Sequence, residues 1–117
     1  MFGLRLLGLL IGLGVCTQVQ AEACAVYSAK AEEPLIRCQQ NRSIPPHLFR
    51  SGFCVAQPEG HHVNSKLMAQ CPLGFQAACR NAQVGNTTYR QDVFYYANQI
   101  PAHVQQDCKR RRGVWMR

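Results

Sequence analysis

The sequence predicts a small α+β domain that is stapled by disulfides and contains a β-hairpin, a C-terminal helix and a short closing strand. Three observations predict it. Six cysteines remain in a short chain once an N-terminal leader is removed, and an even number favours a disulfide framework. Alternating apolar and polar residues precede a turn and a stretch rich in Tyr, Phe and Thr, as in a hairpin. A proline then opens a segment with helical spacing that ends in a basic run and a glycine.

Residues 1–21 have the three zones of a removable signal peptide. Arg5 supplies a positive charge before the apolar stretch 6–15, and Val19-Gln20-Ala21 places short residues where a signal peptidase cuts. Because a membrane span takes roughly 20 apolar residues, this stretch is too short for an anchor. We therefore expect a periplasmic or secreted protein whose mature chain, residues 22–117, is one domain without a transmembrane segment.

Two other outcomes at the leader stay open. Ala21-Glu22-Ala23 also offers small residues at the spacing of a cleavage site, so the cut could fall before Cys24. Leu13-Gly14-Val15-Cys16 has the form of a lipidation box, although valine is bulkier than the Gly or Ala that such boxes carry beside the cysteine. We prefer the cut after Ala21, because it leaves a short polar gap behind the apolar stretch.

The cysteines of the mature chain are expected to form three disulfides, each stabilising the fold by roughly 2–4 kcal/mol. A zinc site is the rival interpretation, but zinc knuckles pair ligands as Cys-x-x-Cys, and the nearest two cysteines, Cys71 and Cys79, are much farther apart. We expect neither a metal nor another cofactor. The pairing stays open, because six cysteines allow about 15 connectivities. The six are Cys24, Cys38, Cys54, Cys71, Cys79 and Cys108.

The first half of the mature chain shows weak periodicity. A short helix is predicted within 29–37, interrupted by Pro34, and a loop is predicted for 41–46, which ends in two prolines. A short strand is predicted within His47–Gln57, which mixes aromatic and β-branched residues, and Pro58-Glu59-Gly60 then turns the chain. We expect no internal repeat and no linker.

The hairpin is the clearest predicted element. Phe75, Ala77 and Cys79 alternate with their neighbours at the two-residue period of a half-buried strand. Val84-Gly85-Asn86 supplies the positive φ angles of a tight turn. Thr87–Tyr96 is rich in residues that suit a pleated surface.

A helix is predicted after the hairpin. Pro101 suits a first helical turn, and Val104 and Cys108 lie four residues apart, so both face the core. Lys109–Arg112 fall in the last turn, where positive charge opposes the helix dipole, and Gly113 is the expected cap. The two apolar residues that follow return to the sheet as the closing strand.

The chain from Cys54 to Trp115 resembles a class of small exported proteobacterial proteins of no assigned activity. Their second half contains a Cys-Pro pair, a Cys-bearing hairpin, a Tyr-rich strand and a closing Cys-x-x-x-Gly-Gly-x-Trp. Arg112 replaces the first glycine of that motif here, and the basic run is not part of the pattern. The resemblance implies a bacterial periplasmic setting and no chemistry. The matching positions are Cys54, Cys71-Pro72, Cys79, Phe94-Tyr95-Tyr96, Cys108, Gly113 and Trp115.

No constellation of residues predicts an active site. His61-His62 could ligate a metal, but neighbours on an extended chain point in opposite directions, which favours an exposed turn. His103 and Asp107 could orient each other on the helix, but no Ser or Thr lies near them in the sequence and the nearest cysteine is expected to be oxidised. Five aromatic residues could form a stacking platform for bases or sugars, or pack the hairpin against the helix, which we favour. They are Tyr89, Phe94, Tyr95, Tyr96 and Trp115.

The C-terminal end is the one strongly charged part. The mature chain carries 12 Lys and Arg against 6 Asp and Glu, yet residues 22–108 hold 7 bases against all 6 acids and are nearly neutral. The basic end therefore predicts either contact with an anionic partner, such as lipopolysaccharide, lipid headgroups or nucleic acid, or a solvated helix end that aids folding. The candidate anion-binding residues are Lys109, Arg110, Arg111, Arg112 and Arg117.

The favoured hypothesis is a non-catalytic, exported binding module that recognises an envelope protein or an anionic envelope component. One alternative is a small disulfide-rich hydrolase, which would use either His103 with Asp107 or a metal bound at His61-His62. The other alternative is an anion-binding protein that acts through its basic end.

Overall fold

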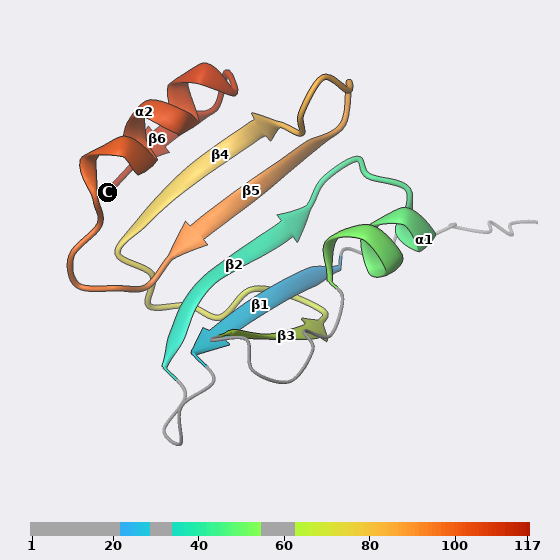
Figure 1. Ribbon diagram of the computed structural model, residues 1–117, viewed down its shortest axis with the longest axis horizontal. Coiled ribbons are helices and arrows are strands. Elements are labelled where there is room, and N and C mark those ends of the chain that lie inside the picture. The colour runs from blue at the N-terminus through green and yellow to red at the C-terminus, as the bar shows by residue number, and fades with distance from the viewer. Residues whose placement is uncertain (1–21, 29–33, 55–62) are drawn as a thin grey trace, which may run out of the picture.

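The computed structural model describes residues 22–28, 34–54 and 63–117, which form an antiparallel sheet with helical segments (Figure 1). Six described strands lie in the order β3-β1-β2-β5-β4-β6, and the predicted α+β class is confirmed. The strands are β1 (Ala23–Ser28), β2 (Leu35–Asn41), β3 (Val63–Met68), β4 (Ala77–Gln83), β5 (Arg90–Tyr95) and β6 (Val114–Met116). The helical segments are α1 (Pro46–Leu48), the π-helical turn η2 (Phe49–Phe53) and α2 (Ala102–Arg110).

The predicted hairpin, C-terminal helix and closing strand are confirmed. β4 and β5 pair antiparallel across a turn in which Gly85 has a φ of 53° and the Val84 N–H donates to the Tyr89 carbonyl at 3.0 Å. After α2, the chain returns to the sheet as β6, which pairs with β4 and places Trp115 opposite Cys79.

The predictions for the first half are mostly wrong. Residues 35–37 of the predicted helix belong to β2, and residues 47–53 of the predicted strand are helical instead. The helix starts there because Pro45 is its N-cap and the Phe49 N–H donates to the Pro45 carbonyl at 2.9 Å. β1 and β3 were not predicted at all. Residues 29–33 of the predicted helix, residues 55–57 of the predicted strand and the turn Pro58-Glu59-Gly60 lie outside the described residues, as do the predicted signal peptide and the box ending in Cys16.

One row of directly opposite residues crosses the whole sheet, and residues opposite each other share a face. Cys24 and Cys79 belong to this row, so both point to the same side of the sheet. The row runs Leu67, Cys24, Gln39, Val93, Cys79 and Trp115. The helical segments bonded to these two cysteines therefore cover one face, which we call the helical face.

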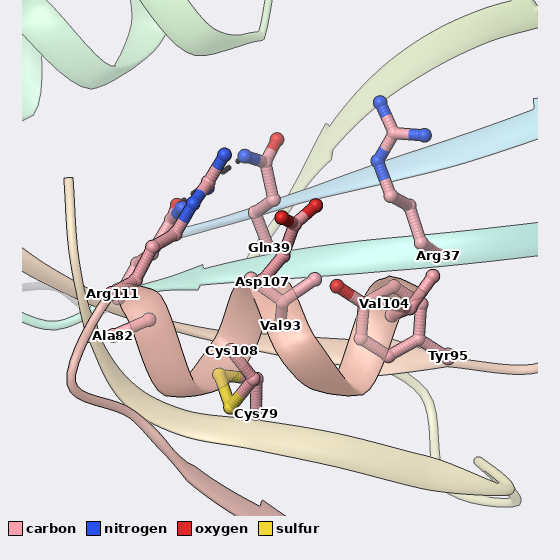
Figure 2. A pocket seen from close by; sticks show the side chains of 11 residues that line it. Arg37, Gln39, Cys79, Ala82, Val93, Tyr95, Val104, Asp107, Cys108 and Arg111 are labelled. Carbon is pink, nitrogen blue, oxygen red and sulfur yellow. Dashed lines mark hydrogen bonds between the residues drawn. A yellow bond between two sulfur atoms is a disulfide. The ribbon is translucent and has the colours of Figure 1, made fainter. Parts of the chain in front are cut away.

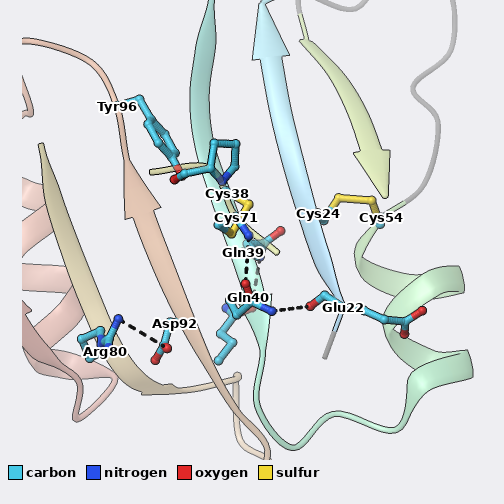
Figure 3. Close-up of a disulfide and its surroundings, with 12 residues drawn as sticks. Glu22, Cys24, Cys38, Gln39, Gln40, Cys54, Cys71, Arg80, Asp92 and Tyr96 are labelled. Atoms are coloured by element: carbon cyan, nitrogen blue, oxygen red, sulfur yellow. Dashed lines mark hydrogen bonds and ion pairs between the residues drawn. A yellow bond between two sulfur atoms is a disulfide. The ribbon is translucent and has the colours of Figure 1, made fainter. Parts of the chain in front are cut away.

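The predicted three disulfides are confirmed, and each joins a strand to a segment that covers the sheet. Cys24–Cys54 holds the end of η2 and Cys79–Cys108 holds α2, both against the helical face. Cys38 of β2 points to the opposite face, where it bonds Cys71 (Figure 3). Cys71 lies in the segment 69–76, which must cross the sheet because β3 is at one edge and β4 is near the other. The three disulfides therefore clamp a cover onto both faces.

These clamps matter because the core is made of small side chains. The largest fully buried side chains are Phe49, Cys24 and Cys38. Small residues let the covers approach the sheet closely but bury little apolar area, and burial contributes about 25 cal/mol per Å². The disulfides therefore supply a large share of the stability. The buried alanines are Ala23, Ala25, Ala77, Ala78 and Ala82.

The C-terminus of α2 differs from the predicted cap. The helix ends at Arg110, so only Lys109 and Arg110 lie in its last turn, and Arg112, with a φ of 61°, takes the left-handed conformation. Gly113 is not needed as the helix cap. It is needed because a Cβ atom at this position would collide with the Sγ atoms of Cys79 and Cys108. At the other end, Pro101 is the N-cap and does not lie inside the first turn.

The expectation that the chain has no repeat is also wrong. Residues 23–68 and 77–116 each form a hairpin, then a helical segment, then a strand that pairs antiparallel with the first strand of its own hairpin. In each half a disulfide joins that first strand to the helical segment, with sequence separations of 30 and 29. The two halves meet where β2 pairs with β5, and an approximate twofold axis passes between Gln39 and Val93.

When the two halves are aligned by their strand register, matching residues also become visible in the sequence. The first strand of each half contains an Ala-Cys pair, at 23–24 in β1 and at 78–79 in β4. Leu67-Met68 and Trp115-Met116 pair with these residues at matching positions. Ile-Pro-x-His followed by an apolar residue occurs at 44–48 and at 100–104. The prolines have nearly the same conformation, with φ and ψ of −53° and 135° at Pro45 and −59° and 147° at Pro101.

Candidate anion-binding groove

A groove of about 350 Å³ lies on the helical face, between the two central strands and α2 (Figure 2). Its walls combine residues from β2, β5 and α2, so it forms at the junction of the two halves. The residues that carry its polar chemistry are Arg37, Gln39, Gln91, Tyr95, Asp107 and Arg111.

The floor of the groove carries two amides. The Gln39 side chain of β2 donates from Nε2 to Oε1 of Gln91 in β5 at 3.3 Å, and Gln91 is 2% exposed. A buried amide held in this way keeps a fixed orientation, because both partners lie on paired strands. The floor therefore presents oriented donors and acceptors beside the apolar side chains of Ala82 and Val93.

Two cations flank this floor. Arg37 projects from β2, and Arg111 follows the last turn of α2; Figure 2 shows them at opposite ends of the groove with Gln39 and Asp107 between them. Arginine presents donors in a planar fork that matches carboxylate and phosphate oxygens. The pair is thus suited to an anion that enters the groove.

The Tyr95 hydroxyl is within electrostatic range of all three charged groups of the groove. Burial raises the pKa of Tyr95 above its ordinary value of 10.0, Arg37 and Arg111 lower it, and Asp107 raises it. The ring packs against Trp115 with centroids 5.8 Å apart. The hydroxyl therefore stays protonated at neutral pH and is available as a donor.

The negative charge in the groove has a partner outside it. Asp107 Oδ1 lies 3.0 Å from Nη1 of Arg110, and the two side chains are 45% and 72% exposed. An exposed pair three residues apart on a helix contributes little to stability, about 0.3–0.5 kcal/mol. It does offset the charge of Asp107, which leaves Arg37 and Arg111 as the dominant charges of the groove.

The five residues of the predicted basic end lie in different places in the structure. Lys109 and Arg110 lie in the last turn of α2, Arg111 is its C-cap and Arg112 takes the left-handed conformation, so the four bases do not form one helical run. Only Arg111 lines the groove, while Arg110 pairs with Asp107. Arg117 follows β6, and its guanidinium lies 5.9 Å from the centre of the Trp115 ring. Lys109 and Arg112 are exposed outside the groove.

The other sequence candidates do not form a site in the described residues. Asp107 is paired with Arg110, and His103 lies on an exposed position of α2. His61-His62 lie outside the described residues. No group of three or more His, Cys, Asp or Glu side chains suited to a metal occurs within the described ranges.

The five aromatic residues do not share a platform. Phe94 packs on Phe75 in a tilted arrangement on the face opposite the groove, with ring centroids 4.7 Å apart, whereas Tyr95 packs on Trp115 on the helical face. The Tyr96 hydroxyl donates to the Pro72 carbonyl at 2.6 Å. Tyr89 packs in the cluster around Phe49. The favoured interpretation, packing of the hairpin against the helix, is therefore confirmed for Tyr95 and Trp115, which lie against the cluster that contains Cys108, and is wrong for the other three.

A second polar cluster, on the opposite face, has a structural role. Asp92 is 4% exposed and accepts the Asn81 N–H at 2.7 Å, where a bulge in β4 gives Asn81 a φ of 59°. Arg42 lies 3.0 Å from the same carboxylate and Arg80 lies 3.9 Å away (Figure 3 shows the Arg80 contact). The carboxylate therefore holds the bulge and is satisfied by its own neighbours.

Sequence reasoning missed Arg37, Gln39 and Gln91. All three lie on strands, and in β2 the polar side chains Arg37 and Gln39 recur at the two-residue period of one sheet face. That alternation was available in the sequence, but residues 29–37 were interpreted as a short helix that Pro34 interrupts. Their meeting with Arg111 depends on the pairing of β2 with β5, which no local pattern shows.

Comparison with protein-family models, with curated proteins and with solved structures finds no match. Within the described residues, no helix is long and apolar enough to cross a membrane. The three disulfides are consistent with a compartment outside the cytoplasm.

Proposed function

We propose that this chain is an exported, non-catalytic binding module of the bacterial envelope, and that the groove between β2, β5 and α2 takes an anionic group. The observation that carries the proposal is the placement of Arg37 and Arg111 at opposite ends of an amide-floored groove. The leader at 1–21, the three disulfides and the resemblance to small exported proteobacterial proteins support export.

The groove suits a small hydroxylated anion. Its volume of about 350 Å³ is at the lower end for small-molecule sites, which favours one sugar-sized group over an extended polymer. The arginines suit a carboxylate or phosphate, and the Gln39 amide, the Tyr95 hydroxyl and Asp107 suit hydroxyl groups. A carboxylated or phosphorylated sugar of the cell envelope combines both features.

Binding is favoured over hydrolysis because the groove offers no activated nucleophile in the described residues. A hydrolase needs a Ser, Thr, Cys or Lys that a base activates, or a pair of carboxylates. The cysteines that line the groove, Cys79 and Cys108, are joined in a disulfide, and within the described residues the lining holds one carboxylate. Asp107, the carboxylate of the lining, is paired with Arg110.

The test is the affinity of oxidised residues 22–117 for galacturonate, galactose and inorganic phosphate. Trp115, the single tryptophan of the chain, packs on Tyr95 and gives a fluorescence readout. Galacturonate or phosphate should bind and galactose should not. Arg111→Gln and Arg37→Gln should each weaken binding by about 10-fold or more, because a hydrogen bond to a charged group contributes about 1.5–3 kcal/mol.

Arg112→Gln is the matched control, since it removes the neighbouring charge outside the groove. It should change the affinity less than 3-fold or so, as expected for a screened surface charge. Equal losses in the Arg111 and Arg112 variants would show unspecific attraction to the basic end. Hydrolysis of an envelope saccharide by the pure domain would contradict the non-catalytic role.

A further inference from the structure

Glu22 is fixed as part of the domain. Its carbonyl accepts the Asn41 N–H at 2.8 Å and Nε2 of Gln40 at 3.3 Å (Figure 3 shows the Gln40 contact). Its Oε2 lies 2.7 Å from Nε of Arg50, which ties the start of β1 to η2. The residue is 8% exposed. Glu22 therefore contributes contacts to two other elements and belongs to the folded protein.

Ala23 is equally integrated. It is fully buried and pairs with Gln40 of β2 on one side and with Met68 of β3 on the other. A mature chain that began at Cys24 would lose both residues, and the Asn41 N–H would lose its acceptor. The first residue of such a chain would also carry a charged amine at the Cys24–Cys54 disulfide, in a fully buried position.

One oxygen of Glu22 remains without a partner. Within the described residues, Oε1 is buried and has no hydrogen-bond partner, although Oε2 is paired with Arg50. A buried carboxylate oxygen in this state is unfavourable, so its presence needs an explanation. The repeat shows that the fold does not demand a carboxylate here, because the matching position of the second half is Ala77.

We propose that the leader is cut between Ala21 and Glu22, and that the amine freed by the cut pairs with the unpartnered Oε1 of Glu22. This rests on the export part of the proposed function and not on the groove. Water adds across the peptide bond in the endopeptidase: the Ala21 carbonyl carbon takes the hydroxyl and becomes a carboxylate, and the Glu22 nitrogen leaves as an amine that is protonated. The new ammonium lies on the same residue as the carboxylate, so the pairing requires no movement of another segment.

The position of the cut is tested by expressing the full chain, residues 1–117, in a bacterium and measuring the intact mass and N-terminal sequence of the protein in the periplasm. The proposal expects a chain that starts at Glu22. A chain that starts at Cys24, a lipidated Cys16 or an uncleaved chain would overturn it. The groove is tested separately, because ligand binding by residues 22–117 does not depend on how they were produced.

The pairing is tested by the melting temperature of residues 22–117 with a free N-terminus and of the same domain with its amine acetylated. Glu22→Gln should lower the melting temperature by about 5 °C in the free form and by clearly less in the acetylated form. Asp107→Asn, which changes an exposed carboxylate, is the control and should shift both forms equally. An equal effect of Glu22→Gln in both forms would overturn the pairing while leaving the cleavage result intact.

Discussion

The two halves of the molecule share a plan but use their helical segments differently. In the first half, η2 buries Phe49 completely in a cluster with Ile44 and Cys24. In the second half, α2 is longer and regular, yet Cys108 is its one buried residue. One helical segment is held by a packed aromatic ring as well as a disulfide, and the other is held mainly by its disulfide.

This difference explains where the groove lies. Around η2, apolar side chains fill the space above the sheet, including Phe53, Val84 and Tyr89. Beneath α2 the apolar cluster is small, and the strands beside it present Arg37, Gln39 and Gln91, which make the floor of the groove partly polar. The repeat therefore supplies two equivalent covers, and the less tightly packed one provides the candidate binding site.

The largest expected effect compares the equivalent disulfides. Replacing Cys24 and Cys54 by Ala, or Cys79 and Cys108 by Ala, should each lower the free energy of unfolding by about 3–4 kcal/mol, because the loops have almost the same length. Urea denaturation measures the loss. Hydrogen exchange should show that α2 loses protection without its disulfide, whereas η2 keeps more because Phe49 still anchors it. Equal loss of protection in both helical segments would contradict the difference between the halves.

A smaller effect compares one glycine from each half. Gly113→Ala should lower the free energy of unfolding by about 1–3 kcal/mol, because the added Cβ would press on the Cys79–Cys108 disulfide. Gly52→Ala is the matched control: its Cβ would meet Leu48 Cδ1 at 3.8 Å, an ordinary contact, and alanine favours a helical turn. Thermal unfolding of both variants measures the contrast. A neutral Gly113→Ala would show that α2 is free to shift away from the sheet.

The smallest effect concerns Tyr95 in the groove. Burial raises its pKa above 10.0, so the folded state holds the phenol proton more tightly than the unfolded chain. The resulting stabilisation is complete below about pH 10 and is lost as the pH rises through the raised pKa of the folded state. Tyr95→Phe should therefore lose less stability than the wild type above pH 10 or so. A tyrosinate absorbance step for Tyr95 below its ordinary pKa would contradict the assignment.

The second half was predictable because its patterns are local. The hairpin shows alternation and a glycine turn, and Pro101, Cys108 and Gly113 mark the helix and its exit. The first half was not, because β1 is buried at four consecutive positions and so shows no alternation. In β2 a single buried residue, Cys38, lies among polar neighbours.

The repeat was hidden for a related reason. The segment from Ile44 to Cys54 is two residues longer than that from Ile100 to Cys108, and it includes the wider π-helical turn. The matching residues of the two halves therefore have different spacings in the sequence. They can be aligned only once the pairing of the strands is known. Likewise, the basic end was predicted, but the second cation of the groove was not. Arg37 lines the same groove as Arg111 only because β2 pairs with β5.

The most direct test of the groove is a nuclear magnetic resonance titration of ¹⁵N-labelled residues 22–117 with the anion that binds in the affinity measurements. We expect the largest shifts at Gln39, Gln91 and Arg111, with side-chain changes at Arg37. Shifts confined to Arg112 and Arg117, or spread evenly over the basic end, would contradict a built site at the junction of the two halves.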